Sequence, residues 1–298
     1  MNRPLLILCP GQGGQHAAMF DLARTNAAAS ALLDQAAIGI DPATLFDNAT
    51  AQPAIVAAAL AMWAALAPRL PAPALVAGYS IGELAAWGVA GALAPQDALA
   101  LARVRAGAMD AAARSGPAQV LAAVSGLAVE RVAALAAQHG FEVAIVNGYD
   151  ACIAGGLEQG LAKFTAAVAH ESGKLQRLPV AVASHTSLMA PAVGVVEAAL
   201  AAAAFHAPAC PVLSGVAAVR LSGKGEAVRD LSRQLVKTIR WSDCMDAAVE
   251  AGIGVALELG PGAALARMMQ ARHPGVACRS VADFRSIDGI VAWVERQG

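Results

Sequence analysis

The sequence predicts an α/β protein in which a mostly parallel sheet domain is interrupted by a small ferredoxin-like domain. Short, continuously apolar segments alternate with helical patterns in the first and last thirds of the chain, as in a parallel sheet covered on both faces. The middle third instead follows the order βαββαβ, which is typical of a ferredoxin-like unit. We therefore expect a discontinuous α/β domain over 1–115 and 188–298, with an inserted domain over 116–187.

The first segment of the α/β domain is predicted from apolar runs and glycine or proline boundaries. The apolar stretch "PLLILCP" predicts a buried strand, and a glycine loop follows it. "ALVAGYS" predicts a second strand of the same kind. The helical patterns around these strands cover 53–67, 82–92 and a segment that starts at Pro95 and ends near Arg114.

The inserted domain begins near Gly116–Pro117 and ends near Pro179. Its predicted elements are the strand "QVLAAVS", a helix over 128–139, the strands "EVAIVN" and "ACIAGG", a helix over 158–172 and the strand "KLQRLP". The α/β pattern then resumes with the strands "CPVLSGV" and "GVALELGPG". We expect a cleft between the two domains.

Composition excludes several classes of protein. The chain is 57% hydrophobic, but its longest uncharged apolar run, 54–67, is shorter than the roughly 18 to 20 residues that cross a bilayer. A net charge of −1 without a basic run argues against nucleic acid as a partner, so we expect neither nucleic acid nor membrane binding. Five scattered cysteines without a CxxC pattern favour a reducing cytoplasm and no metal site.

Gly78-Tyr79-Ser80-Ile81-Gly82 fits the pattern G-x-S-x-G between a predicted strand and a predicted helix. In that context the pattern is typical of a sharp turn that exposes a nucleophilic serine. Ser80-x-x-Glu83 also fits a capping box, in which Ser80 would only begin the helix. The two flanking glycines favour the nucleophile, because a capping box does not need them.

A serine nucleophile requires a base, and the chain has six histidines. His139 and His170 end the two predicted helices of the insert, where a structural role is expected. His185, in "VASHTSLM", lies where the chain returns to the α/β domain and could face Ser80. A structural role for His185 remains the alternative.

Arg105 lies within the apolar stripe that Leu101, Val104, Ala108 and Met109 form on the predicted helix after Pro95. A guanidinium on an inward face requires a buried anion. That anion could be a carboxylate of the protein, or a substrate carboxylate bound in a bidentate manner.

The loop Gly11-Gln12-Gly13-Gly14-Gln15 follows the first predicted strand. Its glycines could cradle a phosphate, but no Walker lysine follows them and the dinucleotide fingerprint is absent. The other possibility is an oxyanion loop in which Gln12 or a backbone N–H faces the cleft.

Six segments, taken in order, resemble the malonyl-CoA:acyl-carrier-protein transacylase family over nearly the whole chain. They are "PGQGGQ", "GYSIGE", "VRAGAM", "VNGYDACIAGG", "SHTSLM" and "RQLVKTIRW…LELGPGAAL". The resemblance implies a hydrolase-like α/β domain with a ferredoxin-like insert, in agreement with the element pattern. It also implies no bound cofactor, because the substrates are a CoA thioester and the phosphopantetheine-type arm of a carrier protein.

The resemblance implies a role for each site residue. Ser80 would be the nucleophile, His185 the base, and Arg105 the clamp for the free malonyl carboxylate. Gln12 and the backbone N–H of Ile81 would form the oxyanion hole. A glutamine carbonyl, assigned to Gln234, would orient the histidine in place of an aspartate.

Two departures from the family pattern concern pathway. This chain has Tyr79 where fatty-acid-type members usually have histidine, and Gly14 where they have serine. Tyr79 resembles the transacylase subunit of malonate decarboxylase, so the expected partners are malonyl-CoA, that enzyme's carrier protein and its other subunits. The alternatives are a fatty-acid or polyketide malonyl transacylase, a thioester hydrolase, and a docking subunit without turnover.

Overall fold

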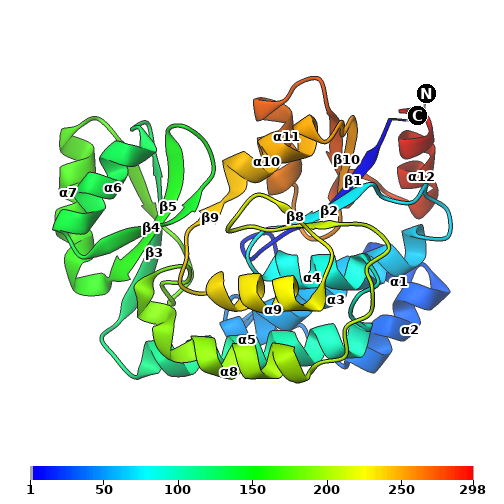
Figure 1. The fold of residues 1–298 in the computed structure, drawn as a ribbon, viewed down its shortest axis with the longest axis horizontal. Coiled ribbons are helices and arrows are strands. Elements are labelled where there is room, and N and C mark those ends of the chain that lie inside the picture. Colours follow the sequence, from blue (N-terminus) through cyan, green and yellow to red (C-terminus); the bar gives the residue numbers. More distant parts are fainter. Residues whose placement is uncertain (1–2, 298) are drawn as a thin grey trace.

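Two β-sheets organise the chain, and the computed structural model describes residues 3–297 (Figure 1). The larger sheet contains, in spatial order, β11 (Ala277–Ser280), β10 (Val255–Glu258), β1 (Leu5–Cys9), β2 (Leu75–Gly78), β7 (Val212–Leu213) and β8 (Arg220–Leu221). The smaller contains β6 (Lys174–Arg177), β3 (Gln119–Ser125), β5 (Ala151–Leu157), β4 (Phe141–Val146) and β9 (Ile239–Arg240).

The larger sheet is mostly parallel, as the sequence predicts. All its described strand pairs are parallel except β7 with β8. Side chains of β1 alternate between two cores: Leu5 and Ile7 enter one, and Leu6 and Leu8 enter the other. A strand buried on both faces must be apolar at every position, which explains the continuous run "LLILC".

Helices cover both faces of the larger sheet. They are α1 (Asp21–Arg24), α2 (Ala27–Ala36), α3 (Asn48–Leu66), α4 (Ile81–Val89), α5 (Pro95–Arg114), α8 (Ala190–Ala202), α9 (Lys224–Arg233), α10 (Trp241–Glu250), α11 (Ala264–Arg272) and α12 (Ile287–Glu295). The core that contains Ile7 includes side chains from α2 to α5, α8, α9 and α12. The core that contains Leu6 includes side chains from α10 and α11.

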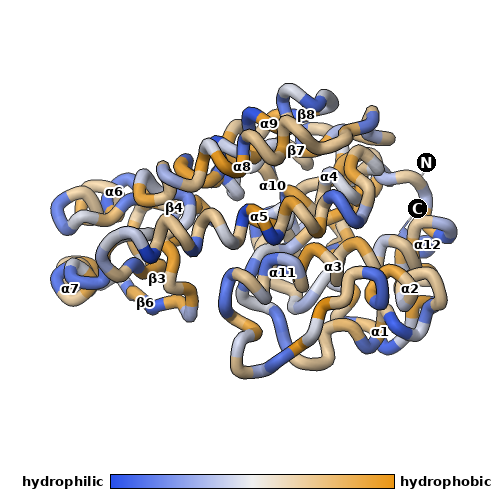
Figure 2. Tube along the Cα trace, turned by 90° about the horizontal axis from the view of Figure 1, so that it is seen from below, coloured by the Kyte–Doolittle hydropathy of each residue, from blue (hydrophilic) through white to orange (hydrophobic). Residues whose placement is uncertain are grey.

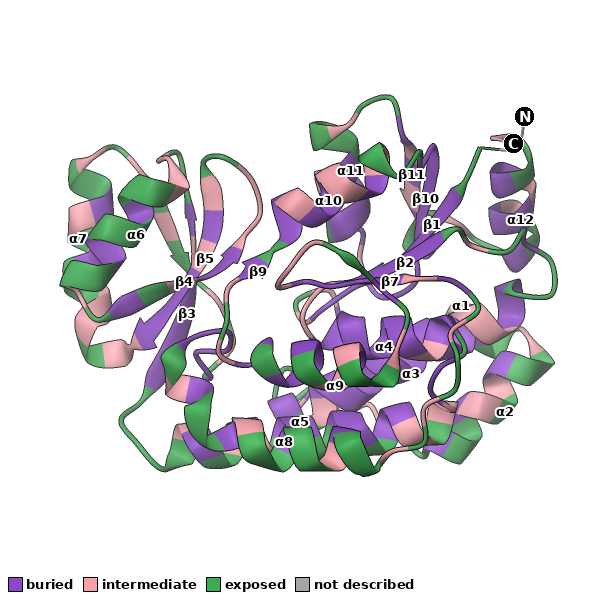
Figure 3. Ribbon diagram, in the orientation of Figure 1, coloured by how far each residue is buried: buried purple, intermediate pink, exposed green. Residues whose placement is uncertain are grey.

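α3 is the central helix of the first of these cores. It is long and apolar enough to cross a bilayer by length and composition, but most of its apolar stretch is buried inside the protein. Figure 2 shows hydrophobic residues along much of this helix. Figure 3 shows that residues of this helix and of the central strands are buried. Its composition is therefore that of a core helix.

The insert has the predicted order βαββαβ, with α6 (Val129–Gln138) and α7 (Leu161–His170) as its helices. Its first four strands are arranged β6-β3-β5-β4, and their pairings are antiparallel. Buried side chains from α6, α7 and the strands form a separate core, in which Phe141 stacks on Phe164. In Figure 1 this unit lies apart from the larger sheet.

α3, β7 and β9 differ from the prediction, and β8 and β11 were not predicted. α3 begins at Asn48 rather than at residue 53, because Pro53 is accommodated early in the helix instead of starting it. Only Val212 and Leu213 of the segment "CPVLSGV" form a strand. The short strand β9 was not predicted: it comes from the α/β domain and pairs with β4 of the insert. Two residues are too few to show a strand pattern.

Candidate active site

Ser80 lies on a sharp turn between β2 and α4, as the G-x-S-x-G pattern predicts. Its backbone has φ 55° and ψ −121°, a conformation that non-glycine residues rarely adopt. A Cβ atom on Gly82 would lie 2.1 Å from the carbonyl oxygen of Cys9, and one on Gly78 would lie 2.2 Å from that of Gly82. Both glycines are therefore required for the backbone to pack around the turn.

His185 contacts the serine directly. Its Nε2 lies 2.8 Å from Ser80 Oγ, and its Nδ1 lies 2.5 Å from the backbone carbonyl oxygen of Gln234. A carbonyl can only accept, so Nδ1 carries the proton and Nε2 has a free lone pair for the serine hydroxyl. This contact explains why no aspartate is needed to orient the histidine.

The surroundings of His185 keep it neutral. Its side chain is buried, and burial followed by the positive charge of Arg105 lowers the pKa of His185 to about 3. The hydrogen bond to Gln234 opposes this shift. A neutral imidazole next to a serine hydroxyl is the form that can accept its proton.

Arg105 is buried in α5, whereas Arg103 on the same helix is exposed, as the predicted stripe requires. Val104, which was assigned to that stripe, is 37% exposed. The Arg105 guanidinium donates to Gln52 Oε1 at 2.6 Å, Gln234 Oε1 at 3.3 Å and Ser80 Oγ at 3.4 Å. Burial lowers the pKa of Arg105 to about 10, which still leaves it charged at neutral pH.

The hydrogen-bond partners of Arg105 decide between the two anions considered from the sequence. All three acceptors are neutral, so the buried cation has no carboxylate in direct contact among the described residues. A buried charge without a counterion is costly. The site is therefore suited to receive an anion beside Ser80.

Gln52 is a site residue that the sequence analysis missed. It extends from α3, and its Nε2 donates to Asn48 Oδ1, whose own amide donates to Asp110. This chain of polar groups fixes the oxygen of Gln52 toward Arg105. The sequence offered one signal for Gln52: the segment "NATAQ" places three uncharged polar side chains directly before an apolar run.

The loop after β1 lies against the serine turn. A Cβ on Gly11 would be 3.6 Å from Ser80 Cβ and 2.7 Å from the carbonyl oxygen of Tyr79, so glycine allows this close approach. Gln12 Nε2 is buried and has no hydrogen-bond partner among the described residues. The N–H of Ile81 is the first of α4, a position without a partner inside the helix. Both are free donors close to the serine turn, as an oxyanion hole needs.

The capping box considered as the alternative role of Ser80 and Glu83 does not form among the described residues. The side chain of Ser80 does not cap α4, because it faces His185 instead. Glu83 is buried, and its Oε2 accepts from Gln234 Nε2 at 2.5 Å and from the N–H of Gly215 at 3.0 Å.

Tyr79 and Gly14, the two departures from the family pattern, both have packing roles. The Tyr79 hydroxyl donates to Asn147 Oδ1 of the insert at 3.1 Å, and its ring packs edge-on against Trp241. A Cβ on Gly14 would lie 2.3 Å from the carbonyl oxygen of Pro261, so a serine there would require the backbone to shift.

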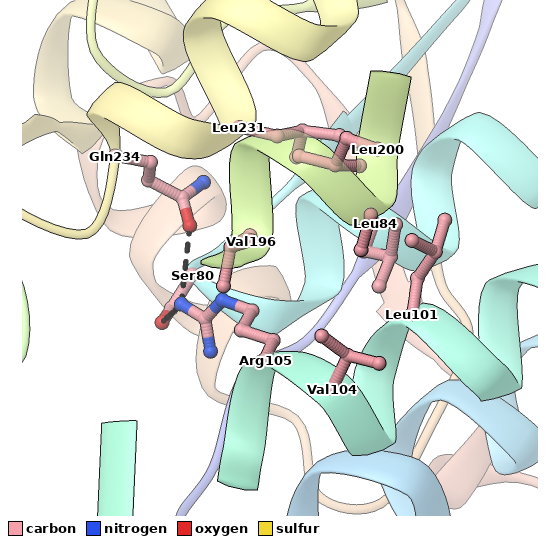
Figure 4. Close-up of a pocket in the computed structure, with 10 residues that line it drawn as sticks. Ser80, Leu84, Leu101, Val104, Arg105, Val196, Leu200, Leu231 and Gln234 are labelled. Atoms are coloured by element: carbon pink, nitrogen blue, oxygen red, sulfur yellow. Dashed lines mark hydrogen bonds between the residues drawn. The ribbon is translucent and has the colours of Figure 1, made fainter. Parts of the chain in front are cut away.

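A small cavity opens beside these groups (Figure 4). Ser80, Arg105 and Gln234 lie at one end of it, and the rest of its lining is apolar. The apolar residues are Leu84, Leu101, Val104, Val196, Ala199, Leu200 and Leu231. Ser80, Arg105, His185 and Gln234 thus come together from four separate segments.

Comparison with known proteins agrees with this geometry. A family model described as an acyl transferase domain matches residues 7–285. The malonyl CoA-acyl carrier protein transacylase of Mycobacterium tuberculosis is 32% identical over 300 residues, covering 95% of this chain and 98% of that protein. The protein of the same name from Escherichia coli is 32% identical over 275 residues, covering 86% and 88%.

A solved structure gives the same result. The malonyl-CoA:acyl carrier protein transacylase of Xanthomonas oryzae is 28% identical, covers 99% of each chain and has a TM-score of 0.92. The family predicted from six sequence segments is therefore confirmed. The chain belongs to the acyl transferase domain family, among the malonyl-CoA:acyl-carrier-protein transacylases.

Proposed function

We propose that this protein transfers a malonyl group from malonyl-CoA to the prosthetic thiol of an acyl carrier protein, through a malonyl ester on Ser80. The observation that carries the proposal is the buried Arg105 guanidinium, which has only neutral partners and lies 3.4 Å from the nucleophilic oxygen. A cation at this distance suits an acyl group that ends in a carboxylate. An acetyl group would leave the charge unpaired.

In the first half-reaction, Ser80 Oγ attacks the thioester carbonyl while His185 Nε2 accepts the hydroxyl proton. The hydrogen bond from Nδ1 to Gln234 stabilises the imidazolium that results. The negative oxygen of the tetrahedral intermediate is assigned to Gln12 Nε2 and the Ile81 N–H. When the C–S bond breaks, His185 returns its proton to the leaving thiolate of CoA.

The second half-reaction runs through the same groups. The carrier-protein thiol gives its proton to His185 Nε2 as its sulfur attacks the carbonyl carbon of the malonyl ester. The C–O bond to Ser80 then breaks, and the serine oxygen takes the proton back from His185. No bound cofactor is needed, because CoA arrives and leaves with the acyl donor.

Of the possible acceptors, we favour a fatty-acid or polyketide carrier protein. The relatives described above are transacylases named for an acyl carrier protein. The contacts of Tyr79 with Asn147 and Trp241 give this residue a packing role, which weakens its value as a marker of malonate decarboxylase. The decarboxylase carrier protein remains the second candidate.

We also propose a cytoplasmic location, in keeping with five free, buried cysteines.

The test is a transfer assay with two acceptors side by side. The protein and its Ser80→Ala variant are incubated with malonyl-CoA and either a fatty-acid or a malonate decarboxylase carrier protein, each with its prosthetic group attached. We expect a malonylated carrier protein with the unmodified enzyme only, and faster transfer to the fatty-acid type. Release of free malonate without carrier loading would instead identify a thioester hydrolase.

A further inference from the structure

A buried carboxyl group lies next to the active site, and the mechanism above does not use it. Glu83 is 1% exposed, on the first turn of α4. Its Oε2 accepts from the side-chain amide of Gln234 at 2.5 Å and from the N–H of Gly215 at 3.0 Å. Its Oε1 has no hydrogen-bond partner within residues 3–297. The hydrogen bond of this carboxyl group to the site is therefore the one to Gln234.

Gln234 contacts two reactive residues at once. Its backbone carbonyl oxygen binds Nδ1 of His185, and its side-chain Oε1 accepts from Arg105 Nη2 at 3.3 Å (Figure 4). The backbone contact is fixed by the chain. The side-chain contact depends on which way the amide is turned, because its oxygen and nitrogen are close to the same size.

Glu83 determines that direction. Its Oε2 accepts a hydrogen bond from the amide nitrogen, and this leaves the amide oxygen to face Arg105. If the amide were reversed, two oxygens would meet at Glu83 and an N–H group would face the guanidinium. The carboxyl group is itself held closely, because a Cβ on Gly215 would lie only 2.7 Å from Oε2.

We propose that Glu83 is a positioning residue for substrate selection: it orients the Gln234 amide, which keeps the Arg105 guanidinium directed at Ser80. This inference rests on the proposed function, since it concerns the malonyl carboxylate bound by Arg105. It assigns Glu83 no contact with substrate. Removing Glu83 should therefore impair recognition of the carboxylate and leave the reactivity of Ser80 and His185 in place.

The contact geometry predicts that a neutral amide can replace Glu83. One oxygen makes both hydrogen bonds, and a glutamine offers one oxygen in the same place. Burial also raises the pKa of Glu83 to about 8, which favours the neutral form, and its proton belongs on Oε1 because Oε2 accepts both hydrogen bonds. Methionine has a similar length and offers no acceptor of comparable strength.

The experiment compares Glu83→Met with Glu83→Gln. The readout is the ratio of kcat/KM for malonyl-CoA to that for acetyl-CoA. We expect Glu83→Met to reduce the ratio about tenfold or more, mainly through a higher KM for malonyl-CoA. Glu83→Gln should restore it to within about threefold. An unchanged ratio in Glu83→Met, whether both kcat/KM values fall equally or neither falls, would overturn the proposal.

Glu258→Met is the matched control. Among the described residues Glu258 is also fully buried, also has one unpartnered oxygen, and also accepts a backbone N–H, that of Ala266, but unlike Glu83 it makes no hydrogen bond to Gln234. Its replacement should leave the ratio unchanged. If it lowers the ratio as much as Glu83→Met does, the loss of any buried carboxyl group is responsible and the positioning role is wrong.

Two further variants keep the test decisive if Glu83→Met does not fold. Gly215→Ala should push the carboxyl group off Gln234 and lower the same ratio. Gln234→Met removes the amide but keeps the backbone carbonyl for His185, and adding Glu83→Gln to it should cause no further loss. Independent, additive losses would overturn the proposal. The proposed function fails separately, if Arg105→Ala leaves the ratio unchanged.

Discussion

Two reactive side chains project from unusual backbone conformations. Ser80 has φ 55° and His185 has φ 64°, both in the left-handed region that non-glycine residues rarely occupy. Strain of this kind persists where the surrounding structure requires it, and it concentrates at functional sites. Here it places the serine oxygen and the histidine nitrogen 2.8 Å apart before any substrate binds.

Arg105→Ala tests the clamp at this scale. We expect kcat/KM for malonyl-CoA to fall by a factor of about 100 or more, because a charge-assisted, buried contact is lost. Turnover of acetyl-CoA should change by less than about threefold, since acetyl makes no such contact. The measurement is the transfer rate of Arg105→Ala and of the unmodified protein with each of the two acyl donors. Arg103→Ala, on the exposed side of the same helix, is the control and should change neither rate.

The depressed pKa of His185 predicts an unusual pH profile. With a pKa of about 3 the imidazole is already neutral at mildly acidic pH, so kcat/KM for malonyl-CoA should be flat between about pH 5 and 7. An acid limb with an apparent pKa near the ordinary histidine value of about 6.5 would contradict this prediction. The unfolded chain binds a proton that the fold excludes, so His185 lowers stability as pH falls from about 6.5 toward 3.

Some site residues could be predicted from the sequence, and others could not. Ser80 and Arg105 could be found from local spacing, because a turn motif and a charge in an apolar stripe are visible within a few residues. The roles of Gln52 and Glu83 could not, because their partners Arg105 and Gln234 lie far away in the chain. For Glu83 the local capping motif was misleading, since a long-range acceptor role replaced it.

Among the elements, those with strong local boundaries were predicted best. α5 runs from Pro95 to Arg114 as expected, because proline at the first helical position fixes its start. The insert was predicted mainly because β3, β4 and β5 have six or seven residues each, which is long enough to show an apolar pattern. β9 has two residues, and its place depends on pairing with β4. Tertiary contacts, rather than local pattern, determine such a strand.

Gly82→Ala tests the turn between β2 and α4. The new Cβ would lie 2.1 Å from the Cys9 carbonyl oxygen, so we expect a loss of roughly 2 to 4 kcal/mol in unfolding free energy and near-complete loss of transfer. Denaturant titration and the transfer assay measure the two effects. Gly107→Ala in α5 is the control: apart from the local helix backbone, no described atom lies within 4 Å of its Cβ position, and helix propensity predicts a gain of up to about 1 kcal/mol. Equal stability of both variants would contradict the packing argument.

At the scale of the whole molecule, the site combines segments spread along the α/β domain with His185 at the end of the predicted insert. Ser80 follows β2, Arg105 lies on α5, His185 precedes α8, and Gln234 follows α9. The Tyr79–Asn147 hydrogen bond and the pairing of β9 with β4 connect this domain to the insert beside the serine turn. The domain limits of 1–115, 116–187 and 188–298 remain predictions.

The most direct measurement of the central claim is the intact mass of the protein after brief mixing with malonyl-CoA or acetyl-CoA, without a carrier protein. We predict a stable mass increase of one malonyl group, located on the peptide that contains Ser80, and little or no acetyl adduct. The Ser80→Ala variant should acquire neither. A malonyl adduct on Ser80→Ala, or equal labelling of the unmodified protein by both donors, would contradict a serine acyltransferase whose buried arginine selects a carboxylated acyl group.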